Sequence, residues 1–294
     1  MKIIRFCLFF SIFSYSLSGF ANAIIETAPS FSMVQELILN DKDPQHTLLV
    51  MDDDDTLTMM PCPSQSNCQY LGGPAWFSWQ ESLPANDSNR VYSSFAQLLN
   101  ISNLLVAMSS DAPVVESDIP AILKTAQQLK MPMLVETARN YETIPATETE
   151  FSNDGILNII ENTALKTPSN NISFPGYYIP EGATRPVAYE NGILYCAGQN
   201  KGLMLQDFLN RIKQVDNIHE IIFVDDTQKN VTDVASAYES DTAINVIGVY
   251  YTYLEAQKNA FTIGPDAKKL QATANAEWHT VDAALKKNLL SLSL

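Results

Sequence analysis

The stretch LVMDDDDTLTMM, residues 49–60, places four consecutive aspartates directly behind an apolar run. That run, TLLVM over residues 47–51, has no room for a helix and is typical of a strand buried on both faces. Because neighbouring carboxylates repel one another, a metal ion, a reaction or solvation on a loop must account for them. Side chains alternate along a strand, so we expect Asp52 and Asp54 to point together, and Asp53 and Asp55 to point elsewhere.

Two further apolar runs also end in polar residues. PMLVET, residues 132–137, ends at Thr137, and EIIFVDD, residues 220–226, ends at Asp225 and Asp226. Strands that alternate with helical patterns predict an α/β fold, with a mostly parallel sheet flanked by helices. Ligands in such folds lie at the carboxyl ends of the strands. We therefore expect these polar groups to meet at one edge of one sheet.

The remaining elements are expected from periodicity. Helical spacing covers residues 32–41, 119–129, 154–165, 201–212, 231–238 and the tail beyond 256. A last core strand is expected over residues 243–251, and a hairpin over 185–198 that turns at Asn191-Gly192. Residues 59–100 are expected to be irregular.

Carboxylates at these strand ends suit a hard divalent cation such as Mg²⁺, which binds a few carboxylates, water and phosphate. An EF-hand beginning at Asp52 is excluded, because it needs Gly at Leu57 and Glu at Pro63. A prenyl-synthase DDxxD motif is excluded because Thr56 replaces its last acid. A magnesium site is the remaining chemical interpretation.

Four ordered motifs resemble those of the haloacid dehalogenase-like hydrolases, including exported acid-phosphatase-like members and an uncharacterised bacterial exported group. They are an apolar strand with DxDxT, a strand ending in Ser or Thr, a Lys at a helix start, and a strand ending in two acids. The matching residues are Asp52, Asp54, Thr56, Thr137, Lys201, Asp225 and Asp226. The resemblance implies a Rossmann-like core with a small cap or flap insertion, here residues 59–100.

The resemblance also implies a reaction. Asp52 would attack phosphorus and become an aspartyl phosphate, while Asp54 would protonate the leaving oxygen and then activate water. Asp52, the backbone carbonyl of Asp54, and Asp225 would hold Mg²⁺, with Asp226 acting through a bound water. Asp226 could equally cap the helix that follows.

The resemblance assigns two residues to substrate phosphate, and each assignment has an alternative. Thr137 would donate a hydrogen bond to phosphate, although it could merely cap a turn. Lys201 would offset the carboxylates; the helix dipole disfavours a lysine at a helix start, which favours such a use over solvation. Arg139 could add a phosphate contact or lie on the surface. Asp53 and Asp55 are expected to be incidental or structural.

The insertion carries a close group of aromatic residues, Trp76, Phe77 and Trp79, which could stack on a substrate or form a buried plug. It also carries Cys62 and Cys68. An oxidising compartment would favour a disulfide between them, because only five residues separate them; free thiols are the alternative. A zinc site is not expected, because the chain has no CxxC and its three histidines are scattered along it: His46, His219 and His279.

Residues 1–23 have the features of a signal peptide: basic Lys2 and Arg5, an apolar centre, and small residues before a cleavage site after Ala23. The alternative, a membrane anchor, needs a longer apolar run. Cleavage removes two basic residues and no acid, so the net charge falls from −15 to −17. Such a charge argues against nucleic acid as a partner. We expect an exported protein, periplasmic or secreted, with residues 24–294 as its hydrolase domain.

These observations favour an exported, Mg²⁺-dependent phosphomonoester hydrolase that acts on a small phosphorylated substrate. Two alternatives remain open: a non-catalytic protein that binds a phosphorylated ligand, and a phosphotransferase that uses an acceptor alcohol in place of water. The sequence does not predict the oligomeric state.

Overall fold

The computed structural model describes residues 23–64, 68–109, 111–165 and 177–289 of the 294-residue chain. Nearly all of the expected signal peptide therefore lies outside the described residues. A seven-stranded sheet with the order β1-β7-β6-β2-β3-β5-β4 organises the chain. The strands are β1 (Ala23–Ala28), β2 (Thr47–Met51), β3 (Met133–Thr137), β4 (Ala188–Glu190), β5 (Ile193–Tyr195), β6 (Glu220–Asp225) and β7 (Asn245–Tyr251). Only the β4–β5 pair among them is antiparallel.

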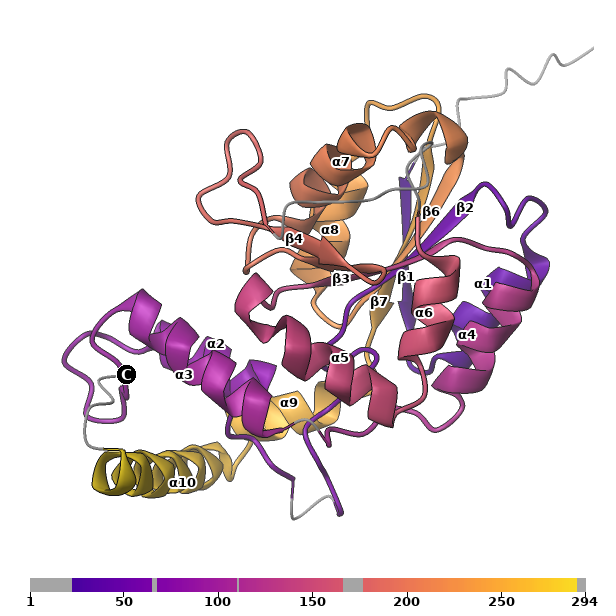
Figure 1. Cartoon of the computed structure of the whole chain (residues 1–294). Helices are drawn as coiled ribbons and strands as arrows, with labels where there is room; N and C mark the ends of the chain where they lie inside the picture. Colours follow the sequence, from indigo (N-terminus) through magenta and orange to yellow (C-terminus); the bar gives the residue numbers. More distant parts are fainter. Residues whose placement is uncertain (1–22, 65–67, 110, 166–176, 290–294) are drawn as a thin grey trace, which may run out of the picture.

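Helices cover both faces of this sheet (Figure 1). One face packs on α1 (Ser32–Asn40), α4 (Ile119–Gln128), α5 (Ile144–Asn153) and α6 (Leu157–Thr163). The other packs on α7 (Lys201–Arg211) and α8 (Gln228–Ala237). Short 3₁₀ turns are η1 (Tyr141–Thr143) and η2 (Val215–Asn217). The predicted α/β class, a mostly parallel sheet flanked by helices, is confirmed.

The central strand β2 shows why short apolar runs form this sheet. Every residue of β2 is buried. Leu49 and Met51 face one hydrophobic cluster, whereas Leu48 and Val50 face the other. A strand covered on both faces needs apolar residues at every position. β2 pairs with β3 on one side and β6 on the other, which aligns the ends of all three.

A second helical unit lies beside the sheet (Figure 1). It consists of α2 (Pro74–Ser82), α3 (Phe95–Met108), α9 (Glu255–Thr262) and α10 (Ala267–Asn288). These helices share a separate hydrophobic core that includes Trp76, Leu98, Phe261 and Trp278. The insertion is therefore completed by the C-terminal part of the chain, and we call these four helices the helical unit.

The expectation of irregular structure over residues 59–100 is confirmed for the described residues outside α2 and α3 and wrong for those two helices. α2 begins at Pro74, a favoured first helical position. At the start of α3 the Ser94 side chain accepts from the backbone N–H of Gln97, and the Gln97 side chain accepts from Ser93. This S-x-x-Q pattern is a helix-start signal that the sequence carries. The Pro, Ser and Asn content of the flanking loops concealed it.

Other differences are smaller. The expected helix over residues 154–165 is present as α6, which is shorter at both ends; α5, which precedes it and ends near Gly155 with its φ of +72°, was not expected. β1 was not expected, and its four central residues are exposed because it lies at the sheet edge. The hairpin is confirmed: Asn191 and Gly192 have φ of +50° and +85° between β4 and β5.

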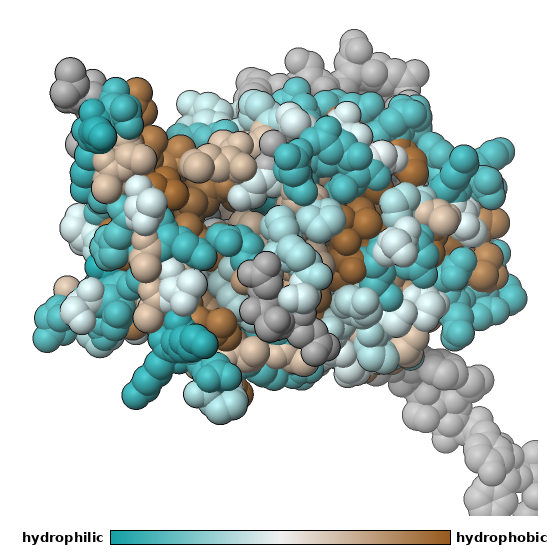
Figure 2. All heavy atoms as spheres, turned by 90° about the horizontal axis from the view of Figure 1, so that it is seen from below, coloured by the Kyte–Doolittle hydropathy of each residue, from teal (hydrophilic) through white to brown (hydrophobic). Residues whose placement is uncertain are grey.

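The surface seen from below is mostly hydrophilic, with hydrophobic side chains showing between the polar ones (Figure 2). Among the described residues, no helix combines the length and the apolar character needed to cross a bilayer.

Candidate active site

Lys201 bridges two strand ends at the carboxyl edge of the sheet. Its Nζ lies 2.5 Å from Asp52 Oδ1 and 2.7 Å from Asp225 Oδ2. Asp52 directly follows β2 and donates its backbone N–H to the Val224 carbonyl, 2.9 Å away, so the two strands fix its position. Lys201 is the first residue of α7, capped by Asn200. These interactions bring together residues that lie 149 and 24 positions apart.

The electrostatics of this group follow from its burial. Lys201 and Asp225 are buried, and Asp52 is only 6% exposed. Burial raises the pKa of Asp52 to about 7; Lys201 opposes that rise, and the negative charge of Asp225 adds to it. Burial alone would lower the pKa of Lys201, but Asp225 and Asp52 raise it. The lysine therefore stays charged and holds the carboxylates together.

Asp226 adds a third buried carboxylate. Carboxylate oxygens of Asp52, Asp225 and Asp226 all lie within 4.8 Å of one another. Lys258 of α9 contacts the Asp226 side chain and donates to its backbone carbonyl, 3.1 Å away. Burial raises the pKa of Asp226 to about 6, and Lys258 opposes the rise. No sequence pattern indicated Lys258, because its helix belongs to the distant C-terminal segment.

Asp225 is also held by the start of α8. The backbone N–H of Thr227 donates to Asp225 Oδ1 at 2.8 Å, and Asn230 Nδ2 donates to the same carboxylate at 3.1 Å. Asp226 N–H donates to Thr56 Oγ1 at 3.1 Å, which ties the end of β6 to the turn after β2. The side chain of Asp226 makes no N-terminal cap of α8, whose flanking residue is Thr227.

Asp54 is held by Arg139 and not by the carboxylate cluster. Arg139 Nη2 and Nε contact the two Asp54 oxygens at 2.8 and 3.0 Å, a bidentate pair. Arg139 Nη1 lies 3.1 Å from Asp53 and 2.8 Å from Glu150 of α5, and also donates to Thr147 at 2.9 Å. The side chain of Arg139 is only 7% exposed, so the surface alternative is wrong.

The turn after β2 depends on the two other aspartates. The Asp53 carbonyl accepts the N–H groups of Thr56, Leu57 and Thr58, and its carboxylate accepts the Thr58 hydroxyl at 2.8 Å. Asp55 has φ of +65°, a left-handed conformation that Asp tolerates better than most residues. Both residues therefore shape the turn that presents Asp52 and Asp54.

Thr137 ends β3 and is fully buried. Its hydroxyl oxygen accepts the backbone N–H of Arg139 at 3.1 Å, the turn-capping interaction expected as the alternative. The hydroxyl proton remains able to donate to another group. Next to it, Glu136 is buried beside the free Cys196, whose thiol donates to Glu136 Oε1 at 3.2 Å.

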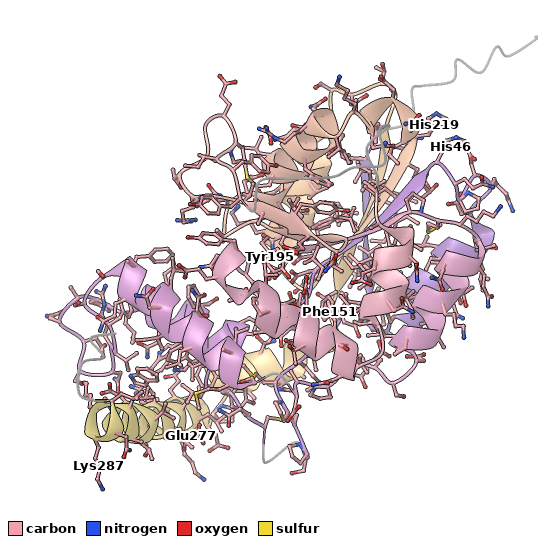
Figure 3. The ribbon with its side chains drawn as sticks, viewed as in Figure 1. His46, Phe151, Tyr195, His219, Glu277 and Lys287 are labelled. Atoms are coloured by element: carbon pink, nitrogen blue, oxygen red, sulfur yellow. A yellow bond between two sulfur atoms is a disulfide. The ribbon has the colours of Figure 1, made fainter. Side chains whose placement is uncertain are left out.

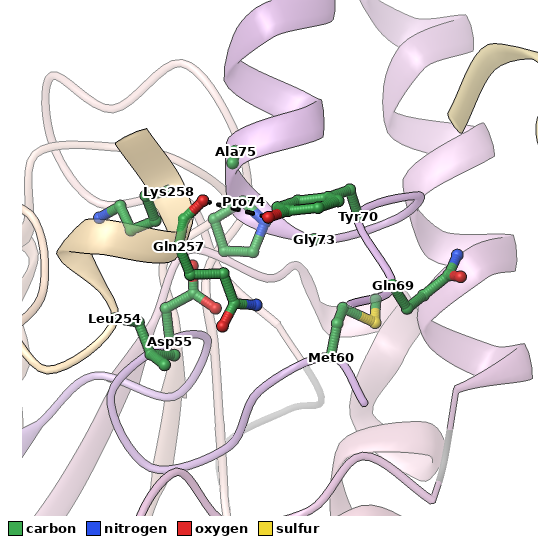
Figure 4. A pocket seen from close by; sticks show the side chains of 10 residues that line it. All are labelled: Asp55, Met60, Gln69, Tyr70, Gly73, Pro74, Ala75, Leu254, Gln257 and Lys258. Carbon is green, nitrogen blue, oxygen red and sulfur yellow. Dashed lines mark hydrogen bonds between the residues drawn. The ribbon is translucent and has the colours of Figure 1, made fainter. Parts of the chain in front are cut away.

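Two pockets lie where the helical unit meets the sheet edge. The first, about 290 Å³ including its open mouth, has Asp55 and Lys258 on one side and Tyr70 and Pro74 on the other (Figure 4). Tyr70 donates to the Gln257 carbonyl at 3.3 Å and so links the insertion to α9. The second, about 260 Å³, is lined by Asp54, Asp55, Thr58, Met59, Met60, Pro74, Val106, Ser109, Ala112, Arg139 and Glu150.

The aromatic residues Trp76, Phe77 and Trp79 pack in the core of the helical unit. Trp76 is fully buried, and Trp79 packs edge-on against Phe261 with ring centroids 5.7 Å apart. Phe77 packs edge-on against Phe95. None of the three lines the two pockets described above. The structure thus favours the buried plug over substrate stacking.

The cysteines are arranged as the sequence suggested. Cys62 and Cys68 are joined by a disulfide, with their Cα atoms 3.9 Å apart. Cys196 is buried, and burial raises the pKa of its thiol well above the usual value. Cys196 is therefore a protonated donor to Glu136.

Comparison with known proteins gives a family. Residues 27–291 match the family described as "Protein of unknown function (DUF2608)". The chain belongs to the DUF2608 family. No curated protein sequence matches it. Among solved structures, it is similar to cytosolic 5'-nucleotidase IIIB bound to cytidine, at 13% identity and a TM-score of 0.37, over 86% of this chain and 92% of that one.

Proposed function

We propose that this DUF2608 protein is an exported, Mg²⁺-dependent phosphomonoester hydrolase with a haloacid dehalogenase-like core. The observation that carries the proposal is the buried Lys201 bridge between Asp52 and Asp225. A structural sheet edge has little reason to bury three carboxylates and a lysine, because each charge costs free energy to desolvate. Perturbed, paired groups of this kind are typical of catalytic sites.

The donor set fits Mg²⁺. Asp52, Asp225 and Asp226 supply hard oxygen ligands that converge from two adjacent strand ends. The three carboxylates carry more negative charge than Lys201 and Lys258 neutralise, so a divalent cation would lower the repulsion that remains between them. When bound, Mg²⁺ would neutralise charge that develops on the phosphoryl oxygens. The carbonyl of Asp54 is the further ligand implied by the resemblance.

The chain's own residues account for two chemical steps. An Asp52 oxygen attacks phosphorus while the bond from phosphorus to the substrate oxygen breaks, and Asp54 gives a proton to that leaving oxygen. Asp54 then takes a proton from water as the water oxygen attacks the aspartyl phosphate. Inorganic phosphate leaves, and the Asp52 carboxylate is restored.

Arg139 would control both steps through its contact with Asp54. Its bidentate pair with Asp54 fixes the orientation of the side chain that serves as acid and base. Proton donation in the first step requires this pair to loosen, and the substrate phosphate supplies the competing anion for the guanidinium. Arg139 would thus contact Asp54, as observed, and also the substrate phosphate, as predicted from the sequence. Thr137 and Lys201 complete the set of donors toward phosphate.

The substrate's alcohol portion would enter beside Asp54. The pocket that contains Asp54 and Arg139 is walled by Pro74 and Val106 of the helical unit. Export is supported by the N-terminal sequence and by the Cys62–Cys68 disulfide, which persists in oxidising compartments.

The test is hydrolysis of p-nitrophenyl phosphate by the purified protein. We expect phosphate release that stops with chelator and returns with Mg²⁺. Asp52→Asn should abolish it, whereas Asp87→Asn, a change in the loop after α2, should leave it intact. Full turnover in chelator, or in Asp52→Asn, would contradict the mechanism.

The same assay separates the alternatives. A phosphotransferase would form a phosphorylated alcohol when glycerol is added, at the expense of free phosphate. A non-catalytic binding protein would give no turnover with a panel of phosphorylated metabolites, yet would be stabilised thermally by one of them.

A further inference from the structure

Two of the chain's three histidines meet at the amino ends of β2 and β6. His46 directly precedes β2 and His219 directly precedes β6. The N–H of His219 donates to the His46 carbonyl at 2.8 Å, and the His219 carbonyl accepts from Asn245 at 2.9 Å. Figure 3 shows the two labelled side chains next to each other. The histidines were expected to be scattered, but His46 and His219 lie side by side in the folded protein.

The imidazole rings share one carboxylate. Their centroids lie 4.9 Å apart with an interplanar angle of 21°. His46 Nδ1 lies 2.8 Å from Asp43 Oδ1, and His219 Nδ1 lies 3.5 Å from Asp43 Oδ2. Asp43 is fixed by a tight turn in which the His46 N–H donates to its carbonyl at 2.9 Å, with Pro44 at the second turn position.

These three side chains form a preorganised donor set. Two imidazole nitrogens and a carboxylate oxygen lie within 4.8 Å of one another. A tetrahedral ion with bonds near 2.1 Å needs donors separated by about 3.4 Å, a small adjustment for surface side chains. The side chains of His46, His219 and Asp43 are 47%, 60% and 56% exposed, so they can rotate without repacking the core.

The local charge favours a cation. Glu220 directly follows His219, and its carboxyl group interacts electrostatically with that of Asp41. Asp41 lies two residues before Asp43, and its side chain accepts the Asp43 N–H at 2.8 Å. Asp41, Asp43 and Glu220 thus place acidic side chains near the two imidazoles, a residue type that binds metal in its unprotonated form.

We propose that Asp43, His46 and His219 bind one divalent transition-metal ion of the zinc class, with water in a fourth position. Imidazole selects such metals over Mg²⁺. The site lies at the opposite end of β2 from Asp52; the chain from His46 to Asp52 spans roughly 20 Å at about 3.3 Å per residue. It is therefore separate from the carboxylate cluster and would tie β2 to β6 at their amino ends.

The test is a Zn²⁺ titration by calorimetry of the protein without a histidine tag, in buffer saturated with Mg²⁺. We expect one Zn²⁺ per chain. His46→Gln and His219→Gln should each weaken binding about tenfold or more, because even the loss of an outer partner of a ligand costs that much. His279→Gln is the matched control: it removes the third, exposed histidine on α10 and should bind like the wild type.

Imidazole NMR spectra give an independent measurement. Zn²⁺ should shift the signals of His46 and His219 and leave that of His279 in place. Circular dichroism checks that each variant is folded. Absence of saturable binding at submillimolar Zn²⁺ would overturn the proposal. Unchanged affinity in a folded His46→Gln, His219→Gln double variant would also overturn it.

Discussion

Replacing Glu136 should change how the stability of this protein depends on pH. Glu136 is fully buried in β3. Burial raises its pKa to about 8, against the opposing effect of Lys201 and of the Cys196 thiol, while Asp225 and Asp52 add to the rise. In the folded protein Glu136 is therefore neutral at physiological pH, whereas in the unfolded chain it ionises near its ordinary value of 4.5.

The sign follows from proton linkage. Between pH 4.5 and about 8, the folded protein keeps a proton on Glu136 that the unfolded chain has lost. The contribution of Glu136 to the free energy of unfolding is therefore largest at low pH and falls as the pH rises through that window. The two pKa values correspond to roughly 3–5 kcal/mol of unfolding free energy over the whole window. Full burial leaves little screening to reduce this value.

Glu136→Gln tests the reasoning, because the amide has the shape of the protonated acid and cannot ionise. Its oxygen can still accept from Cys196. Urea unfolding at a series of pH values should show wild type and variant similar near pH 5, and the variant more stable by about 2–4 kcal/mol near pH 8.5. Glu239→Gln, at an exposed position in the loop after α8, is the control and should follow the wild type throughout.

A constant difference between wild type and Glu136→Gln across the whole pH range would refute the argument. That result would mean that Glu136 is ionised in the folded protein at every pH measured, with a compensating partner.

Three further changes test other features. Gly202→Ala would place a Cβ 2.4 Å from a backbone oxygen of α8, so unfolding free energy should fall by about 3 kcal/mol. Gly73→Ala, which meets only the flexible Met60 side chain under 3.4 Å, should cost less in the same urea experiment; equal losses would contradict the packing argument. Arg139→Lys keeps the charge but not the bidentate pair with Asp54, so kcat should fall about 10- to 100-fold; a wild-type kcat in the folded variant would show that this pair is dispensable. Cys62→Ser should lower the thermal midpoint, reflecting about 2 kcal/mol of lost loop restraint, and reductant should mimic it in the wild type; no difference between oxidised and reduced protein would remove this role.

Local patterns were sufficient to predict the central strands of the sheet and the residues at their carboxyl ends. β2, β3 and β6 are short apolar runs covered on both faces, and only a strand satisfies that pattern at such length. The polar residues at the ends of these strands were predicted from the same local sequence patterns. The convergence of Asp52, Thr137 and Asp225 was expected because parallel strands place their carboxyl ends at one edge.

Contacts between distant segments were not predictable in this way. Lys258 lies 32 residues after Asp226, on a helix of the C-terminal unit, and its neighbours in sequence carry no sign of that contact. Glu150 and Thr147 meet Arg139 only because α5 packs beside the turn after β2.

The sequence by itself determined which residues end the core strands, because alternation and apolar run length act within a few residues. Only the tertiary structure decided which partners those residues meet: Arg139 on Asp54, Lys258 on Asp226, and His46 beside His219. It also decided that the C-terminal helices complete the core of the insertion. The physical reason is that ion pairs and helix packing depend on the distance in space between segments, and a single sequence contains no local record of that distance.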